Sequence, residues 1–351
     1  MKNRFDILDF GAVADGVTDS TAAVQAALDA AAECCGTVLV PAGRYAVGKL
    51  RMHGQGVSLV GGSGWSFRRD GAGVFELNDP TADCMIDICG AVGATVSGMS
   101  LNGKDLGEHI HGIKLWRSQY NGGGEEDTPT VDDCRIGHFS GNAVHLERVW
   151  CFSVRHSMLY HSAAGLYIDG WDGFVLDNWL SGNRKGGMVG GPIVASVTCT
   201  GNRIEWNRGG GILLPNGDSY NITGNFFDRS FGPALALGSE EGRVKTAAVT
   251  GNVFRRSGAC EEEAFSCPEQ SCHVLLRNCD GVTLTGNAMR SGKNDGGEGI
   301  LSPDFGIVLE HCRCSVVQGN TLFQGAIKEN LVLRGENPDC LVESNVGSIK
   351  K

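Results

Sequence analysis

Three aspartates and two tryptophans stand close together in one short segment, GLYIDGWDGFVLDNWLSGN (residues 165–183). A turn between strands needs neither so many acids nor such large rings. Asp172 follows an alternating strand and stands between Trp171 and a glycine, where a carboxylate could act as a general acid or base. Indole rings offer flat apolar faces with a polar edge, a surface suited to sugar rings. The segment therefore predicts acid–base chemistry on a carbohydrate.

The alternation of the same segment predicts which side chains share an outer face. In GLYID (165–169), Leu166 and Ile168 are expected to point inward, while Tyr167 and Asp169 point outward. Two earlier stretches, GIKLW (112–116) and AVHLE (143–147), repeat this pattern. Their outward positions are Lys114, Trp116, His145 and Glu147.

Glu147 and Asp169 are 22 residues apart, as are His145 and Tyr167. If strands at this spacing pair, the two carboxylates lie on neighbouring strands about 4.8 Å apart. Such proximity raises one of the two pKa values, which yields an acid and a base near neutral pH. We expect catalysis from Asp172, Asp169, Glu147 and Glu205, and substrate contacts from Lys114, Trp116, His145, Tyr167, Trp171, Trp206 and Arg208.

Glu205, Trp206 and Arg208 belong to a second cluster, RIEWNRGGGILLPNGDSYN (203–221), and are expected at the lip of the same groove. Its Asn-Gly-Asp is typical of a turn. A structural alternative holds for the acids as well, because exposed acids are commonly solvated and could be paired by Lys114 or an arginine. The histidines have no cysteine or carboxylate at standard zinc spacing, so we expect neither a metal nor a cofactor.

The elements that must position these residues form an internal repeat. A Gly-Asn pair followed by an apolar residue is interpreted as recurring seven times. Alternating strands recur beside it, at a spacing of 22 or 23 residues. The pairs are in SGNAV (140–144), SGNRK (181–185), TGNRI (200–204), TGNFF (223–227), TGNVF (250–254), TGNAM (285–289) and QGNTL (318–322). The asparagine amide is expected to bond the backbone at a turn and to stack on its counterpart one coil away.

Three short strands per coil predict an all-β fold, a right-handed parallel β-helix forming a single domain over residues 1–351. STAAVQAALDAAAECCG (20–36) has helical spacing and is expected to cap the open end of the solenoid. Polar insertions are expected at 121–129, 257–272 and 290–304.

FDILDFGAVADGVTDSTAAVQAALDAA (5–31) followed by GTVLVPAGRYAV (36–47) resembles the N-terminal signature of the pectate-lyase-type β-helix superfamily. That superfamily, which is related to glycosyl hydrolase family 28, includes glycosidases, lyases, epimerases and phage tailspikes. The resemblance implies the fold, while the reaction must be argued from the site.

GWDGFVLDNW (170–179) resembles, more locally, a segment of the difructose-anhydride-forming fructotransferases, which cleave inulin or levan. In that family an aspartate in this loop and a glutamate about one strand later form the acid–base pair. Asp172 matches the first position, whereas Ser181 and Gly182 stand where the glutamate would be. Glu205 or Glu147 would have to substitute. The same resemblance implies a homotrimer.

Composition limits the partners. The formal net charge is −10 and basic residues form no long run, so we do not expect the protein to bind nucleic acid. Apolar runs are too short to span a membrane. The N-terminus lacks the apolar region of a signal peptide, and the 14 cysteines are scattered. We expect mostly free thiols in a cytoplasmic protein.

The sequence favours a carbohydrate-active enzyme that cleaves or rearranges glycosidic bonds of an oligosaccharide, possibly fructan-derived, with paired carboxylates. A first alternative is a uronate lyase or epimerase, for which Lys114, Arg184 and Lys185 could neutralise a substrate carboxylate. A second alternative is a noncatalytic glycan-binding or tailspike-like protein.

Overall fold

The computed structural model describes residues 3–118, 127–259, 270–291 and 302–347. The chain forms two compact units, Met1–Phe174 and Val175–Lys351, and each is described by itself. Most of the predicted insertions at 121–129, 257–272 and 290–304 fall outside the described residues. Within the described part, no helix is long and apolar enough to cross a membrane.

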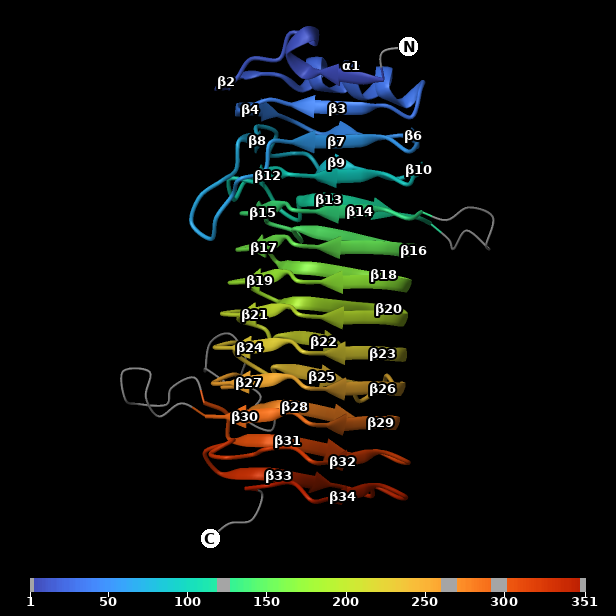
Figure 1. Ribbon diagram of the computed structural model, residues 1–351, viewed down its shortest axis with the longest axis vertical. Coiled ribbons are helices and arrows are strands. Elements are labelled where there is room, and N and C mark those ends of the chain that lie inside the picture. Colours follow the sequence, from blue (N-terminus) through green and yellow to red (C-terminus); the bar gives the residue numbers. More distant parts are fainter. Residues whose placement is uncertain (1–2, 119–126, 260–269, 292–301, 348–351) are drawn as a thin grey trace. The chain divides into compact units, whose positions relative to one another are not determined.

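The first unit is built from parallel strands stacked in three columns, with one strand of each column per coil (Figure 1). Column one holds β5 (Leu50–Arg51), β9 (Cys84–Asp87), β13 (His111–Trp116) and the start of β16 (Val144–Arg155). Column two holds β1 (Arg4–Asp6), β3 (Thr37–Val40), β7 (Ser58–Gly61), β11 (Thr95–Ser97), β14 (Thr130–Asp132) and the end of β16. Column three holds β2 (Asp15–Asp19), β4 (Gly43–Val47), β8 (Gly73–Leu77), β12 (Met99–Asn102), β15 (Arg135–Gly137) and β17 (Met158–Tyr160).

Three further strands complete the first unit. The short strands β6 (Gly54–Gln55) and β10 (Ala91–Val92) pair with each other in parallel. The long strand β18 (Ala164–Leu176) begins in this unit. In β18 the alternation of the sequence buries Leu166 and Ile168 and leaves Tyr167 half-buried.

The second unit repeats the three columns. Column one holds the start of β20 (Gly186–Thr200), β22 (Ile212–Leu214), β25 (Leu235–Leu237), β28 (Cys272–Arg277), β31 (Phe305–Glu310) and β33 (Glu329–Arg334). Column two holds the end of β20, β23 (Gly217–Thr223), β26 (Val244–Thr250), β29 (Cys279–Thr285), β32 (Val316–Gln318) and β34 (Leu341–Glu343). Column three holds β19 (Trp179–Ser181), β21 (Arg203–Glu205), β24 (Phe226–Asp228), β27 (Val253–Arg255) and β30 (Ala288–Arg290).

The register of the coils follows the spacing read from the sequence. Trp116 lies opposite Glu147 in the pairing of β13 with β16, which confirms that the 31-residue gap there contains an insertion. The rings of His145 and Tyr167, 22 residues apart, stack with their centroids 4.6 Å from each other. Inward residues such as Leu115 and Leu146 are fully buried and fill the core. The predicted repeat of short parallel strands is confirmed.

An asparagine ladder joins successive coils at the turn between columns two and three. Each side-chain oxygen accepts from the backbone N–H and the amide of the asparagine one coil earlier, at 2.9–3.1 Å, which confirms the role predicted for the recurrent asparagine. The ladder consists of Asn178, Asn202, Asn225, Asn252, Asn287, Asn320 and Asn345.

Two of the Gly-Asn pairs do not belong to this ladder, contrary to the single repeat read from the sequence. The Asn183 amide donates to Asn207 Oδ1 at 3.0 Å, at a separate turn, and Asn178 takes the ladder place nearby. Asn142 accepts from the backbone N–H of Ala164 and turns its amide toward His145. The same dipeptide serves different corners because a Gly-Asn pair suits any tight turn.

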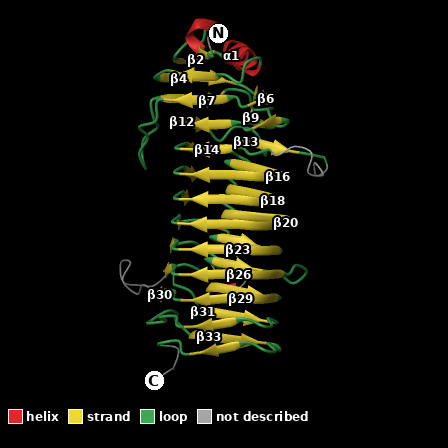
Figure 2. Cartoon of the chain, turned by 45° about the vertical axis from the view of Figure 1, so that its right-hand side comes forward, coloured by secondary structure: helices red, strands yellow, loops and turns green. Residues whose placement is uncertain are grey.

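The predicted N-terminal helix is present as α1 (Thr21–Ala32), shorter than the expected range 20–36. It follows the short 3-10 helix η1 (Ile7–Phe10), and both helices are drawn in red in Figure 2. The apolar side of α1 buries Val24, Ala27, Leu28 and Ala31. Cys35 has a positive φ of 50°, a conformation that a helix cannot continue. That α1 protects the open end of the solenoid remains a prediction.

All 12 cysteines within the described residues are free thiols, in agreement with the reading of scattered small hydrophobes. Six of them are buried, which favours the uncharged form. Burial raises the pKa of the Cys134 and Cys199 thiols to about 12. The reducing compartment inferred from this usage remains a prediction.

Candidate active site

The outer side of column one in the first unit brings together the polar residues that the sequence predicted for one face. Stacked rings run across three coils: His111 lies 4.3 Å from His145, which lies 4.6 Å from Tyr167. Lys114 and Glu147 extend from the same strands, β13 and β16. We name the set His111, Lys114, His145, Glu147 and Tyr167 the column-one face.

His145 is held in one tautomer by its neighbours. Because the side-chain oxygen of Asn142 accepts from the Ala164 N–H at 3.1 Å, its amide must be the group that faces His145. That amide donates to Nδ1 of His145 at 2.9 Å, so Nδ1 carries no proton. The proton is therefore on Nε2, which donates to Oε2 of Glu147 at 3.2 Å. His145 positions the glutamate.

Burial keeps both histidines of the face uncharged. It lowers the pKa of His145 to about 4, with a further contribution from the positive charge of Lys114. Burial and the neighbouring His145 lower the pKa of His111 to about 3. Uncharged imidazoles fit the stack, since two adjacent imidazolium rings would repel each other. At neutral pH the carboxylate of Glu147 therefore accepts a neutral hydrogen bond.

Glu147 and Tyr167 form a possible acid–base pair. The glutamate side chain is one quarter exposed, and its second oxygen lies 3.7 Å from Nη1 of Arg148. Burial raises the pKa of Tyr167, and the charges of Asp169 and Glu147 raise it further, so the phenol is protonated at neutral pH. A carboxylate can accept a proton here, a phenol can donate one, and Arg148 supplies positive charge beside them. Sequence reasoning missed Arg148 because its backbone, with φ of +57°, leaves the regular alternation.

Asp169 is 3% exposed, which contradicts the expectation of an open carboxylate on the outer face. Alternation with Leu166 and Ile168 predicted an outward side chain, but alternation along a strand does not by itself determine contact with solvent. Side chains on neighbouring coils can cover a short aspartate more easily than a longer glutamate. The prediction that Glu147 and Asp169 are both open to solvent is therefore wrong for Asp169.

Asp172 is exposed and lies in the bend of β18 rather than on the column-one face. Its φ of +58° belongs to the left-handed region, which aspartate and asparagine tolerate better than most residues. Its Oδ2 accepts from Nε1 of Trp150 at 2.8 Å, and Trp150 lies against Trp171 with ring centroids 6.3 Å apart. The structure thus shows a local structural role for Asp172, and a catalytic role remains a prediction.

Two other predicted substrate-binding residues of this unit, Trp116 and Lys114, differ in how freely they could contact a ligand. Trp116 is 45% exposed at the end of β13, so its ring is open to a ligand. Lys114 instead donates to Oδ2 of Asp83 at 2.8 Å, and the same aspartate pairs with Lys49. The ammonium group of Lys114 is therefore already paired with a carboxylate of the protein.

Glu205 belongs to the second unit and is not at the lip of a column-one groove. It ends β21 in column three, is 4% exposed, accepts from Nε1 of Trp179 at 2.7 Å and pairs with Nε of Arg203 at 2.7 Å. Both its oxygens are thus occupied, which contradicts the expectation of an open carboxylate at the groove, whereas a catalytic role remains a prediction. Trp206 and Arg208 are exposed, and the Trp206 ring lies 4.8 Å from the guanidinium carbon of Arg229.

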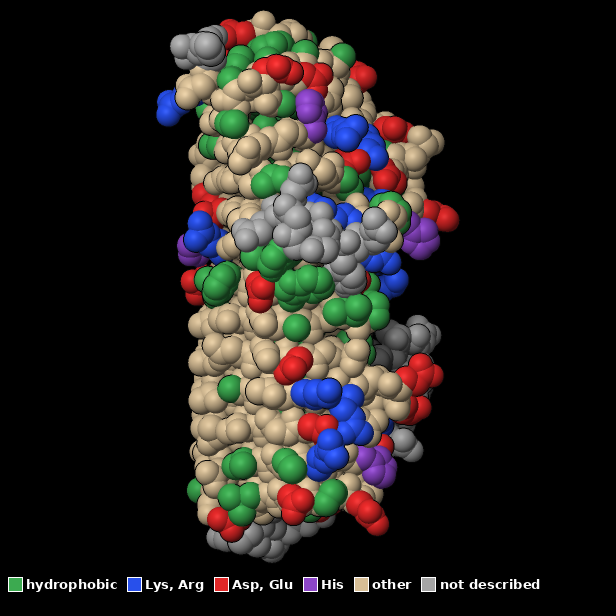
Figure 3. All heavy atoms as spheres, turned by 90° about the vertical axis from the view of Figure 1, so that its right-hand side faces the viewer, with side chains coloured by type: hydrophobic (Ala, Val, Ile, Leu, Met, Phe, Trp, Pro, Cys, Tyr) green, Lys and Arg blue, Asp and Glu red, His purple; other side chains and the backbone are tan. Residues whose placement is uncertain are grey.

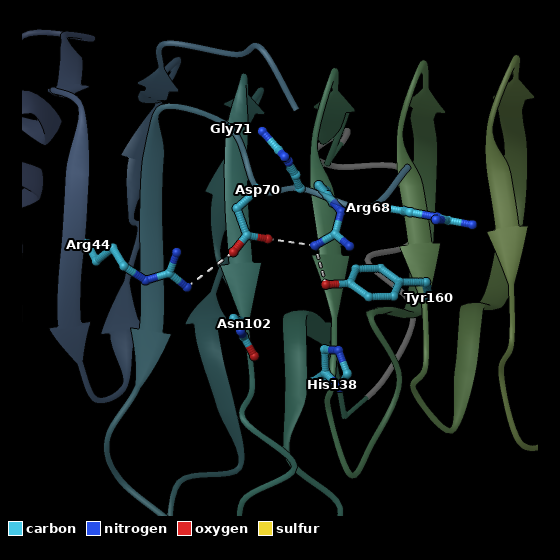
Figure 4. A pocket seen from close by; sticks show the side chains of 9 residues that line it. Arg44, Arg68, Asp70, Gly71, Asn102, His138 and Tyr160 are labelled. Atoms are coloured by element: carbon cyan, nitrogen blue, oxygen red, sulfur yellow. Dashed lines mark hydrogen bonds and ion pairs between the residues drawn. The ribbon is translucent and has the colours of Figure 1, made fainter. Parts of the chain in front are cut away.

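A pocket that the sequence did not indicate lies on column three of the first unit. It measures about 450 Å³. Its lining residues, shown in part in Figure 4, are Arg44, Arg68, Arg69, Asp70, Gly71, Asn102, Arg135, His138 and Tyr160. These residues are spread over more than one hundred positions in the chain, so no local motif announces the pocket.

Comparison with known proteins supports the fold. Residues 5–82 match the family model described as rhamnogalacturonase A/epimerase, pectate lyase-like. A segment of 44 residues is 59% identical to mannuronan C5-epimerase AlgE5 of Azotobacter vinelandii, and covers 12% of this chain and 4% of that relative. The matched stretch is thus a small part of the curated relative.

Two solved structures from the same organism match nearly the whole chain. The A-module of mannuronan C-5 epimerase AlgE6 has a TM-score of 0.65 at 16% identity, covering 99% of this chain and 100% of that one. The A-module of AlgE4 has a TM-score of 0.61 at 19% identity, covering 97% and 100%. Fold and comparisons together define a pectate-lyase-like right-handed parallel β-helix.

Proposed function

We propose that this chain is a carbohydrate-active enzyme that removes the C5 proton of a uronate residue in an acidic polysaccharide, as an epimerase or a lyase. The matched relatives are named mannuronan C5-epimerases, which favours this alternative over the fructan-cleaving reading of the sequence. Asp169, the carboxylate expected to pair with Glu147, is buried, which weighs against a mechanism that needs these two open acids.

The chemistry requires three groups. The C5 proton lies next to the sugar carboxylate, so a cation that binds the carboxylate stabilises the negative charge that develops when the proton leaves. A base then takes this proton. Return of a proton to the opposite face of C5 inverts the centre, whereas cleavage of the C4–O bond with proton transfer to the leaving oxygen gives an unsaturated sugar.

The column-one face, together with Arg148 and Trp116 beside it, contains a group for each requirement. Glu147 accepts the C5 proton, Tyr167 donates a proton, and Arg148 binds the substrate carboxylate. Trp116 supports a neighbouring sugar ring. The observation that supports these roles most directly is the fixed tautomer of His145, because it directs an N–H to Glu147 and keeps that carboxylate in place.

The test is an assay on purified protein with polymannuronate, polygalacturonate and inulin. Proton NMR in heavy water detects inversion at C5 and deuterium uptake there, and ultraviolet absorbance detects an unsaturated product. We expect turnover of a uronate polymer and none of inulin. Fructose anhydrides formed from inulin would refute the proposal in favour of fructosyl transfer.

Variants connect the activity to the face. Glu147→Gln and Tyr167→Phe should each lower turnover by about 10²–10⁴-fold, since general acid–base catalysis contributes that much. Glu343→Gln on β34 removes an exposed carboxylate in the second unit and serves as the matched control. Equal activity of Glu147→Gln and the control would contradict the assignment, while binding of a uronate polymer without any turnover would indicate a glycan-binding protein.

We also propose, from the sequence alone, a cytoplasmic location and a homotrimer. A cytoplasmic location is tested by fractionation of the source cells, with recovery in the exported fraction as the contrary result. A homotrimer is tested by light scattering, where a monomer at working concentrations would count against it.

A further inference from the structure

The pocket on column three is built around a buried cation. Arg135, on β15, is 8% exposed, and its Nη1 donates to Oδ1 of Asp70 at 2.5 Å and to the hydroxyl of Tyr160. The guanidinium carbon lies 4.0 Å from the centre of the Tyr160 ring. Figure 4 shows the side chains of Asp70 and Tyr160 at the middle of the pocket. The arrangement holds Arg135 rigidly at the wall of the pocket.

The single carboxylate of the lining is already shared. Nη2 of Arg44 lies 3.1 Å from the second oxygen of Asp70, so Asp70 is placed between two arginines. Arg44 also pairs with Glu76. Asp70 and Glu76 therefore balance the charges of Arg44 and Arg135.

Two more arginines nevertheless line the pocket. Arg68 and Arg69 lie at the tip of a segment that an isolated bridge between Ser66 and Arg69 closes on itself. Neither makes an ion pair with any of the residues that the structure describes. On the face of the molecule in Figure 3, by contrast, acidic and basic side chains are interspersed. Two uncompensated guanidinium groups beside Arg44 and Arg135 favour an anion.

Neutral donors complete the lining. Because the Tyr160 hydroxyl accepts from Arg135, its own proton is free to be donated, and burial raises the pKa of Tyr160 to about 12, which keeps that proton in place. Asn102 adds an amide. His138 lies edge-on to the Tyr160 ring, with centroids 5.2 Å apart, and its Nδ1 is 3.0 Å from Asp105. Cations with hydroxyl and amide donors match a sugar that carries a carboxylate.

We propose that this pocket is a second, noncatalytic subsite that binds the carboxylate of a uronate residue and anchors an acidic polysaccharide to column three. Arg68 and Arg69 bind the carboxylate, and Tyr160 and Asn102 bind hydroxyl groups of the same sugar. A volume of about 450 Å³ accommodates one such residue. Anion binding follows from the pocket itself, whereas the choice of a uronate depends on the proposed function.

Calorimetric titration of the full chain tests the subsite. The protein carries Glu147→Gln so that the ligand is not converted, and the titrants are a uronate oligosaccharide, a neutral oligosaccharide of equal length and inorganic phosphate. Arg68→Gln combined with Arg69→Gln should weaken uronate binding on the order of tenfold or more. Arg255→Gln combined with Arg290→Gln, at exposed arginines of β27 and β30, is the matched control and should leave binding unchanged.

The outcomes separate this proposal from the proposed function. Equal uronate affinity in the Arg68/Arg69 variant and the control overturns the subsite, even if the wild-type protein turns over a uronate polymer. Arginine-dependent uronate binding without any turnover supports the subsite and refutes the enzyme. Phosphate that binds as tightly as the uronate oligosaccharide, and competes with it, shows a simple anion site and overturns the sugar assignment.

Discussion

Acidification should destabilise the first unit through His145. Burial lowers the pKa of His145 to about 4 in the folded state, against an ordinary value of about 6.5 for histidine. Between these values the unfolded chain binds more protons than the folded one, so the free energy of unfolding falls as pH falls. The stabilisation is fully present above pH 6.5 and is lost as pH approaches 4. Its size is about 3 kcal/mol in total, of which about 2 kcal/mol is lost between pH 6.5 and 4.5.

His145→Gln isolates this contribution. Glutamine keeps one acceptor for the Asn142 amide and one donor for Glu147, but it does not titrate. At pH 7 the variant should unfold within about 1 kcal/mol of the wild type. At pH 4.5 the wild type should have lost about 2 kcal/mol more than the variant. Burial also lowers the pKa values of His111 and His273 to about 3, so both proteins should share a remaining loss.

The assay is urea unfolding at several pH values between 7 and 4.5, followed by tryptophan fluorescence. Trp65, Trp116, Trp150 and Trp171 belong to the first unit, whereas Trp179 and Trp206 belong to the second, so the transitions of the two units are fitted separately. His109→Asn, at an exposed residue with φ of +57°, is the control, because asparagine also tolerates that conformation. If His145→Gln and the wild type lose the same stability over this range, His145 is not held uncharged by burial, and the argument for its tautomer fails.

Further expected outcomes test single positions. Asp172→Asn should keep the melting temperature, because asparagine retains both the left-handed backbone and the acceptor for Trp150, while Asp172→Ala should cost about 1–2 kcal/mol of unfolding free energy; a large loss of activity in the stable Asp172→Asn protein would establish a catalytic role. Asn225→Leu should destabilise the second unit by about 3–5 kcal/mol in calorimetry, since it leaves Asn202 donors buried without partners; a cost below 1 kcal/mol would contradict the ladder. Glu205→Gln should lower stability with activity per folded molecule unchanged, and a kinetic defect without loss of stability would restore its catalytic reading.

Much of the fold was predictable because the sequence of a solenoid repeats with the length of one coil. The 22-residue spacing of His145 and Tyr167 sets which strands are neighbours, and alternation within GLYID sets which side chains point inward. The recurrent asparagine follows from the same logic, since each coil must turn at the same corner. These features depend on nearby residues and on one repeat length, so a single sequence is enough to predict them.

Exposure and pairing were decided by the tertiary structure. The sequence could place Asp169 and Glu147 on one face, but not show that Asp169 is covered while Glu147 stays open. Nor could the sequence show that Arg203 and Trp179 donate hydrogen bonds to the two carboxylate oxygens of Glu205. Burial depends on the side chains of neighbouring coils, which a repeat positions only to the nearest strand.

The sequence by itself therefore determined the coil, the register and four residues of the column-one face: Lys114, His145, Glu147 and Tyr167. Only the folded chain determined that Asn142 fixes the proton of His145, and that Arg44, Arg68 and Arg135 gather in one pocket. The reason is physical: backbone periodicity acts through local geometry, whereas a hydrogen-bonded tautomer or a cluster of like charges arises from contacts between residues many positions apart.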